Sequence, residues 1–76
     1  MTKTDLLDYL NRTGSIEAAE VAAAFGENYS STAMALLRLC RQGLANRFLE
    51  PGSRGYGYEL TDRGADRLAY LQDLMS

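Results

Sequence analysis

Residues 30–43, with the sequence SSTAMALLRLCRQG, constrain the fold of this chain more than any other segment. Hydroxyl residues at the start of this segment can cap the free N–H groups of a helix, and the closing Gly43 suits a left-handed C-terminal position. Residues at helical spacing form one stripe that we expect to pack inward: Thr32, Leu36, Leu39 and Gly43. The side chains away from this stripe should meet solvent or a partner: Ser31, Met34, Arg38, Arg41 and Gln42.

Two shorter helices are predicted before this segment. The first is capped by Thr4 and runs to about Arg12, with an apolar face made of Leu6, Leu7 and Leu10. The second runs from Glu17 to Phe25 and is rich in alanine, which allows another helix to approach closely. Across the whole chain we expect five side chains to be almost fully buried: Leu36, Leu39, Val21, Phe25 and Leu68.

A β-hairpin and a last helix are predicted after residue 43. Residues 44–60 alternate in polarity around the turn pair Pro51-Gly52, and Ile16 is available as a third, minor strand. Thr61 can cap the last helix, whose predicted inward stripe is Ala65, Leu68, Leu71 and Met75. Gly64 stands in the first turn of that helix, where glycine costs roughly 1 kcal/mol relative to alanine, so we infer close packing against a neighbour.

The order of these elements predicts a winged helix-turn-helix, in which the central helix is presented to the major groove of DNA. The fold class is therefore α+β and mainly helical, with a three-helix core, a β-hairpin wing at about 44–60 and a C-terminal helix. We expect a single domain over residues 1–76, because this length supports one small core and no separate sensor or catalytic domain.

The distribution of charge favours contact with nucleic acid, although the net charge of the chain is −2. Within residues 30–58 the four arginines outweigh the single acid, Glu50: Arg38, Arg41, Arg47 and Arg54. This window carries a net charge of +3 and leaves −5 for the rest of the chain, which gives a local positive patch and an orienting dipole. The alternative is four solvated arginines on an ordinary surface.

Catalysis and metal binding are not expected. The chain contains no histidine, so the usual general base at neutral pH is absent, and one cysteine cannot build a zinc site or an intrachain disulfide. Cys40 is expected to be a half-buried packing residue; the alternative is a redox-sensitive thiol beside Arg41. We expect no cofactor, no membrane contact and a cytoplasmic location, because neither a long apolar run nor a secretory segment is present.

Three short stretches carry a resemblance to a known family. They are GSI at 14–16 followed by EVA at 20–22 and FG at 25–26, then LCRQGL at 39–44, then RGYGYELTDRG at 54–64. They resemble the second helix, the end of the recognition helix and the wing of winged-helix regulators of the MarR and PadR kind. Two positions depart from that pattern, since the family usually has an acidic residue where Gly52 stands and often a Ser, Thr or Asp cap where Glu17 stands.

By position, the resemblance implies a set of DNA contacts. On the central helix these are Ser30, Ser31, Thr32, Met34 and Arg38, and on the wing Arg47 and Arg54. Three further side chains are candidates: Arg41, Gln42 and Tyr56. Like Arg38, Arg41 could fork onto guanine or bind a phosphate, Gln42 lies away from the inward stripe, and Tyr56 could stack or hydrogen-bond at the DNA backbone. Tyr58 is expected to pack beneath the wing. The longer flanking helices through which the family dimerises are missing, and ligand sensing by the larger proteins is not transferred to this chain.

The central helix leaves a second function open, because Met34 and Leu37 make it unusually apolar for a reader of bases. The alternative is a winged-helix module that binds a protein partner instead of DNA. Burial of both side chains would remove the main support for that alternative. Self-association is also expected, as a weak homodimer through the last helix, where Leu74 points off the main stripe; the competing possibility is that the first helix covers this face within one subunit.

Overall fold

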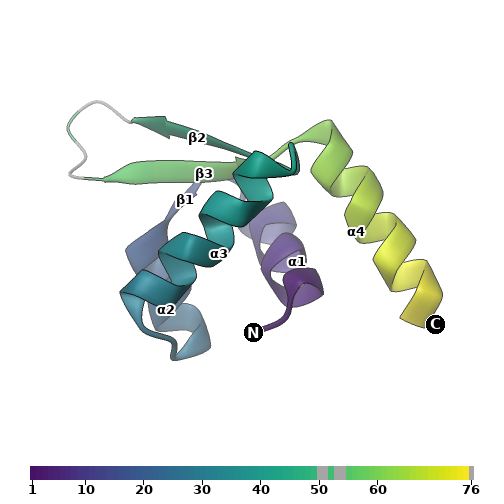
Figure 1. Cartoon of the computed structure of the whole chain (residues 1–76), viewed down its shortest axis with the longest axis horizontal. Helices are drawn as coiled ribbons and strands as arrows, with labels where there is room; N and C mark the ends of the chain where they lie inside the picture. Colours follow the sequence, from purple (N-terminus) through teal and green to yellow (C-terminus); the bar gives the residue numbers. More distant parts are fainter. Residues whose placement is uncertain (50–51, 53–54, 76) are drawn as a thin grey trace.

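The computed structural model describes residues 1–49, 52 and 55–75. Within them the elements follow in this order: α1 (Lys3–Thr13), β1 (Ile16–Glu17), α2 (Ala18–Phe25), α3 (Tyr29–Arg41), β2 (Ala45–Leu49), β3 (Tyr56–Leu60) and α4 (Asp62–Met75). Helices α1, α2 and α3 pack beneath a small sheet, the hairpin projects at one end and α4 at the other (Figure 1). The predicted fold class, a mainly helical α+β winged helix, is confirmed.

The sheet has the strand order β1-β3-β2 and is antiparallel throughout. Ile16 pairs with Tyr58, which confirms that Ile16 supplies a third, minor strand. The hairpin register runs from Ala45 opposite Leu60 to Leu49 opposite Tyr56. Gly52 has a φ of 81°, as its predicted turn position requires, whereas Pro51 lies outside the described residues.

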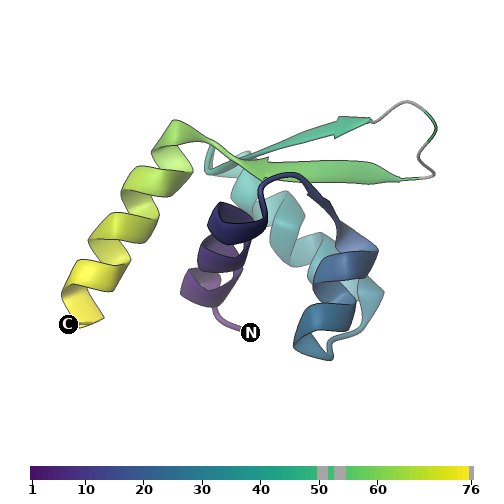
Figure 2. The same cartoon turned by 180° about the vertical axis from the view of Figure 1, so that it is seen from behind.

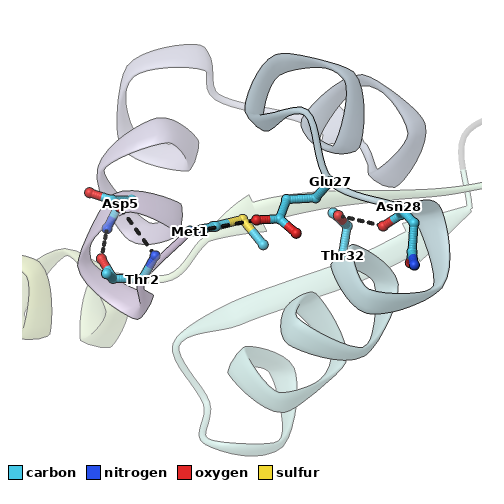
Figure 3. Close-up of polar contacts among 6 residues, drawn as sticks. All are labelled: Met1, Thr2, Asp5, Glu27, Asn28 and Thr32. Carbon is cyan, nitrogen blue, oxygen red and sulfur yellow. Dashed lines mark hydrogen bonds and ion pairs between the residues drawn. The ribbon is translucent and has the colours of Figure 1, made fainter.

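Helix α1 is capped by Thr2, and the prediction that Thr4 caps it is wrong. The side chain of Thr2 accepts the N–H of Asp5 at 3.1 Å, and the Asp5 carboxylate accepts the N–H of Thr2 at 3.1 Å (Figure 3). Thr2 is favoured because an acidic residue stands three positions later, whereas Leu7 stands three positions after Thr4 and cannot return the bond. The hydrogen bonds from Thr2 lower the pKa of Asp5.

Helix α3 begins at Tyr29 and is capped by Asn28, not by a hydroxyl residue. The Asn28 side chain accepts the N–H of Ser31 at 2.7 Å. The hydroxyl of Thr32 donates to the Asn28 carbonyl at 3.0 Å (Figure 3). At the other end Gly43 has a φ of 76°, which confirms its left-handed conformation. The N–H of Leu44 returns to the carbonyl of Leu39 at 2.9 Å, closing a Schellman motif.

The core lies where α1, α2, α3 and α4 meet the inner face of the sheet. It consists of Leu6, Leu7, Leu10, Ile16, Ala18, Val21, Leu36, Leu39, Leu44, Ala45, Tyr58 and Leu68. Of the five side chains predicted to be buried, four are at most 3% exposed. Phe25 is the exception: it is half-buried in the last turn of α2, where its ring lies edge-on to that of Tyr9 at 5.3 Å between centroids. Gly43 is exposed and is not part of the inward stripe.

The start of α4 is locked to the end of α3. Thr61 caps α4 as predicted, because its hydroxyl oxygen accepts the N–H of Gly64 at 2.9 Å. The same hydroxyl donates to the carbonyl of Gly43 at 2.7 Å, and the N–H of Thr61 donates to the carbonyl of Leu44 at 3.0 Å. A Cβ on Gly64 would overlap the carbonyl oxygen of Leu44, so the inference of close packing at this glycine is confirmed.

Helix α4 packs against α1 along a narrower stripe than predicted. Leu68 is buried and Leu71 is half-buried, but Ala65 is exposed. Gly64, Leu68 and Leu71 are spaced by four and three residues and so share one face, which turns Ala65 to solvent. The side chain of Met75 lies outside the described residues.

Candidate nucleic-acid interface

One face of α3 is turned to solvent. The core takes Thr32, Leu36 and Leu39 from this helix, so the side chains on the opposite side of the helix point outward. The exposed side chains of α3 after Tyr29 are Ser30, Ser31, Met34, Arg38 and Arg41. Four of them, Ser30, Ser31, Met34 and Arg38, line an open depression of about 320 Å³. This face is the surface that α3 can offer to a partner.

Thr32 does not belong to this exposed face, and its assignment as a DNA contact is corrected. Its side chain is 0% exposed, and its hydroxyl donates to the carbonyl of Asn28. The prediction from helical spacing, that Thr32 points inward, is therefore confirmed. The prediction from the family pattern, that Thr32 contacts DNA, is wrong. Thr32 secures the first turn of α3 from within the core.

Arg38 and Arg41 extend the exposed face through the last turn of α3. They are three residues apart, so their side chains are neighbours on the helix surface. Among the described residues neither arginine forms an ion pair with a carboxylate, and both guanidinium groups are exposed. Gln42 follows the helix, is exposed, and accepts a hydrogen bond from the Lys3 ammonium group at 2.7 Å. This end of α3 is therefore a positively charged surface whose exposed N–H groups can donate hydrogen bonds to a partner.

Arg47 adds a third guanidinium group from strand β2. The guanidinium carbon lies 4.2 Å from the centroid of the Tyr56 ring on β3, a cation–π stack. Tyr56 is 44% exposed, so the stacked pair is on the surface of the hairpin. A stacked guanidinium keeps its edge N–H groups free to donate, for example to phosphate oxygens. Arg54, the other predicted wing contact, lies outside the described residues.

Tyr58 packs beneath the hairpin, as predicted, with an exposure of 5%. It stands opposite Arg47 in the register of the hairpin. Burial raises the pKa of the Tyr58 phenol, and the charge of Arg47 opposes that rise. Tyr58 therefore supports the sheet from below, and Tyr56 is the tyrosine of the pair that is available at the surface.

Cys40 is half-buried on α3, in agreement with its expected role in packing. Burial raises the pKa of its thiol, an effect that the neighbouring charge of Arg47 only partly offsets. A raised pKa keeps the thiol protonated, and the thiolate is the reactive form. The alternative of a redox-sensitive thiol activated by Arg41 therefore has no support in the structure.

The apolar side chains of α3 are distributed unevenly. Met34 is 46% exposed, whereas Leu37 is half-buried. Burial of both side chains, which would remove the main support for a protein-binding module, is therefore not observed, and the exposed apolar surface expected of this pair comes mainly from Met34. The larger exposed apolar side chains of the C-terminal region are on α4, where Tyr70 is 59% and Leu74 is 66% exposed.

Membrane-spanning helices and metal-binding clusters are both absent from the described part of the chain. No helix there is long and apolar enough to cross a membrane. In the same residues, no group of three or more side chains of the types that ligate metals is gathered in one place.

Neither a protein-family model nor a curated protein matches this sequence. Solved structures do match. The apo form of wild-type MarR from E. coli superposes with a TM-score of 0.88 and 22% sequence identity, over 95% of this chain and 54% of MarR. RV1404 from Mycobacterium tuberculosis gives a TM-score of 0.84 and 29% identity, over 93% of this chain and 49% of RV1404.

This chain has the fold of the MarR regulators. A mutant MarR from E. coli in complex with operator DNA gives a TM-score of 0.89 and 21% identity, over 97% of this chain and 54% of that MarR chain. The present chain therefore spans about half the length of the MarR structures that it matches. The shared half contains all the elements described above, the exposed face of α3 and the hairpin included.

Proposed function

We propose that this chain is a DNA-binding transcription regulator that inserts α3 into the major groove. The observation that carries the proposal is the exposed face of α3, where hydroxyl groups, Met34 and two arginines free of acidic partners among the described residues lie side by side. A MarR structure that matches nearly the whole chain was solved with operator DNA, which supports this use of the fold.

Within this proposal the candidate residues divide by position. Ser30, Ser31 and Met34 lie in the N-terminal half of α3, and recognition helices read bases with their N-terminal residues. Arg38 follows Met34 by one helical turn on the same face, and its long side chain extends the base-reading set toward the end of the helix. Three of the remaining candidates lie at the end of α3 or on the hairpin, where phosphates would pass: Arg41, Gln42 and Arg47. Arg54, outside the described residues, is assigned to the phosphates from the sequence alone. Tyr56 supports Arg47 through their stack.

The proposal includes no catalytic step, and it places the chain with the DNA in the cytoplasm. It also includes a weak homodimer through α4, supported by the exposure of Tyr70 and Leu74. A symmetric pair would present two copies of α3 to half-sites about one helical turn apart.

A selection experiment tests the proposal. Duplexes that contain a randomised segment are enriched on the immobilised protein, and the affinity of the winning duplex is measured by fluorescence anisotropy at low and moderate salt. We expect enrichment of a defined sequence, and a loss of affinity for it in Arg38→Ala. Arg12→Ala is the charge-matched control, because Arg12 lies on α1, which is behind α3 in Figure 1 and in front in Figure 2.

A pool that never converges would contradict the proposal. The same holds if the wild type and both variants bind every duplex with the same feeble affinity that salt abolishes. In that case the arginines of α3 are incidental, and the protein-binding alternative gives the better account of Met34.

A further inference from the structure

Met34 is placed at the centre of the exposed face of α3. It is 46% exposed and shares the open depression with Ser30, Ser31 and Arg38. Every other apolar side chain of α3 after Tyr29 is buried or half-buried: Ala33, Ala35, Leu36, Leu37, Leu39 and Cys40. The helix therefore turns one flexible apolar side chain outward and surrounds it with polar groups.

The chemistry of a thioether limits what this side chain can recognise. Its sulfur is a weak hydrogen-bond acceptor, so Met34 offers mainly a polarisable apolar contact. The edges of base pairs in the major groove present hydrogen-bonding groups and one apolar group, the C5-methyl of thymine. If the helix lies in the major groove, the group on the base edges that suits an apolar contact with an outward methionine is therefore the thymine methyl group.

Arg38 fixes what lies next to the methyl group. It is one helical turn after Met34 on the same face, about 6 Å along the helix axis. This distance corresponds to about two base-pair steps. A guanidinium group free of acidic partners among the described residues can fork onto the O6 and N7 atoms of guanine.

We propose that α3 recognises a 5-methylpyrimidine through Met34, so that the binding site contains a thymine within about two base pairs of a guanine contacted by Arg38. The inference rests on the proposed function, because it requires α3 to lie in the major groove. Ser30 and Ser31 can pair with donors or acceptors of either base pair and do not set this preference.

The test uses the duplex recovered from the randomised pool. Each thymine of the site is replaced in turn by deoxyuridine, which removes only the methyl group. At one thymine in each half-site we expect the affinity of the wild type to fall about fourfold, equivalent to ~0.8 kcal/mol for one methyl-sized group. When that thymine is replaced by cytosine, 5-methylcytosine should bind more tightly than unmodified cytosine.

Variants assign the effect to the side chain. Met34→Ala should bind the thymine and deoxyuridine duplexes equally, whereas Met34→Leu, which keeps an apolar side chain, should retain the preference. Arg38→Ala is the matched control within the site: its affinity falls, but its preference for the methyl group remains. Equal denaturation midpoints for the wild type and Met34→Ala exclude a loss of fold.

The outcomes separate the inference from the function on which it rests. If the wild type binds the selected site but ignores the loss of every methyl group, the inference is overturned and DNA binding stands. The inference also fails if Met34→Ala keeps the full preference for thymine. If the pool yields no preferred duplex, the proposed function fails and this inference with it.

Discussion

The absence of a side chain at Gly64 brings α4 against the end of α3. The backbone carbonyl of Leu44 occupies the space that a Cβ would need, and the Leu60 side chain closes the same site at 2.7 Å from where that Cβ would lie. Sequence alone indicates that another part of the chain must pack closely here, because glycine in the first turn of a helix otherwise only lowers the stability of the helix. Which atom approaches depends on tertiary packing, and no local pattern encodes it.

We expect Gly64→Ala to destabilise the protein by about 1–3 kcal/mol, since overpacking outweighs the gain in helix propensity. Urea denaturation measures the change. Ala69→Gly, at an exposed position of the same helix, is the control and should cost about 1 kcal/mol from propensity alone. Stabilisation by Gly64→Ala would show that Leu44 yields easily and that the close approach is unimportant.

Leu39 tests the inward stripe of α3. It is 3% exposed in the centre of the core, so Leu39→Ala should cost about 2–5 kcal/mol through reduced burial and a residual cavity. Met34→Ala, on the opposite face of the same helix, should change stability by less than about 0.5 kcal/mol. Equal melting temperatures for the wild type and Leu39→Ala would refute the register of the helix.

At the scale of whole elements, the sequence predicts which segments form helices and strands better than where each begins. The competition between capping residues explains the errors: Thr2 displaces Thr4 because Asp5 completes a reciprocal pair, and Asn28 displaces the serines that follow it. Thr32 shows a related limit, since the periodicity of the helix places it inward while its family position places it outward. The prediction from helical periodicity is the correct one, because the packing of this chain's own core decides which side chains are buried.

The helix and the hairpin should contribute differently to DNA binding. Arg47→Ala on the hairpin, like Arg54→Ala, should weaken binding to all duplexes about equally and reduce the slope of log K against log salt by about 0.9 for each phosphate that is no longer neutralised. Arg38→Ala should instead relax discrimination between sites by about 1–3 kcal/mol, if Arg38 forks onto guanine. Anisotropy titrations with the selected duplex and a scrambled duplex, over a range of salt concentrations, measure both effects.

Tyr56→Ala provides the comparison for the hairpin. It leaves the charge of Arg47 in place but removes the ring on which the guanidinium stacks. Its affinity should fall less than that of Arg47→Ala, and its salt dependence should remain closer to that of the wild type. A variant of Tyr56 with the salt slope of Arg47→Ala would mean that the stack itself is required for the phosphate interaction.

At the scale of the whole molecule, large apolar side chains are exposed on the hairpin as well as on α4. Leu49 on β2 and Leu74 on α4 are each 66% exposed, and α4 projects from the end of the molecule opposite to the hairpin (Figure 1). Composition alone gives a hydrophobic content of 46% and does not show which of these side chains are exposed. The structure shows that α1 covers α4 at Leu68 but leaves Leu74 exposed, a distinction that requires the angle between the two helices.

If the exposed part of α4 mediates self-association, Leu74→Asp should shift the protein to monomer. Sedimentation velocity at concentrations up to the millimolar range measures the shift, and Arg12→Ala serves as the surface control. Binding of the selected duplex by Leu74→Asp should also weaken, because a monomer engages one half-site only. A wild type that sediments as a monomer at millimolar concentration would rule out the dimer.

The hydrogen bonds from Thr61 to the carbonyls of Gly43 and Leu44 fix the direction in which α4 leaves the end of α3. With its 14 residues, α4 is about 21 Å long, and its start is fixed to the end of α3, so that α4 can act as a lever that pivots there. A rotation of about 10° at this pivot would displace the far end of the lever by about 4 Å, close to one base-pair step of about 3.4 Å. In a dimer joined through α4, the rigidity of the hydrogen bonds between Thr61, Gly43 and Leu44 would therefore determine which spacing between two half-sites the protein can bind.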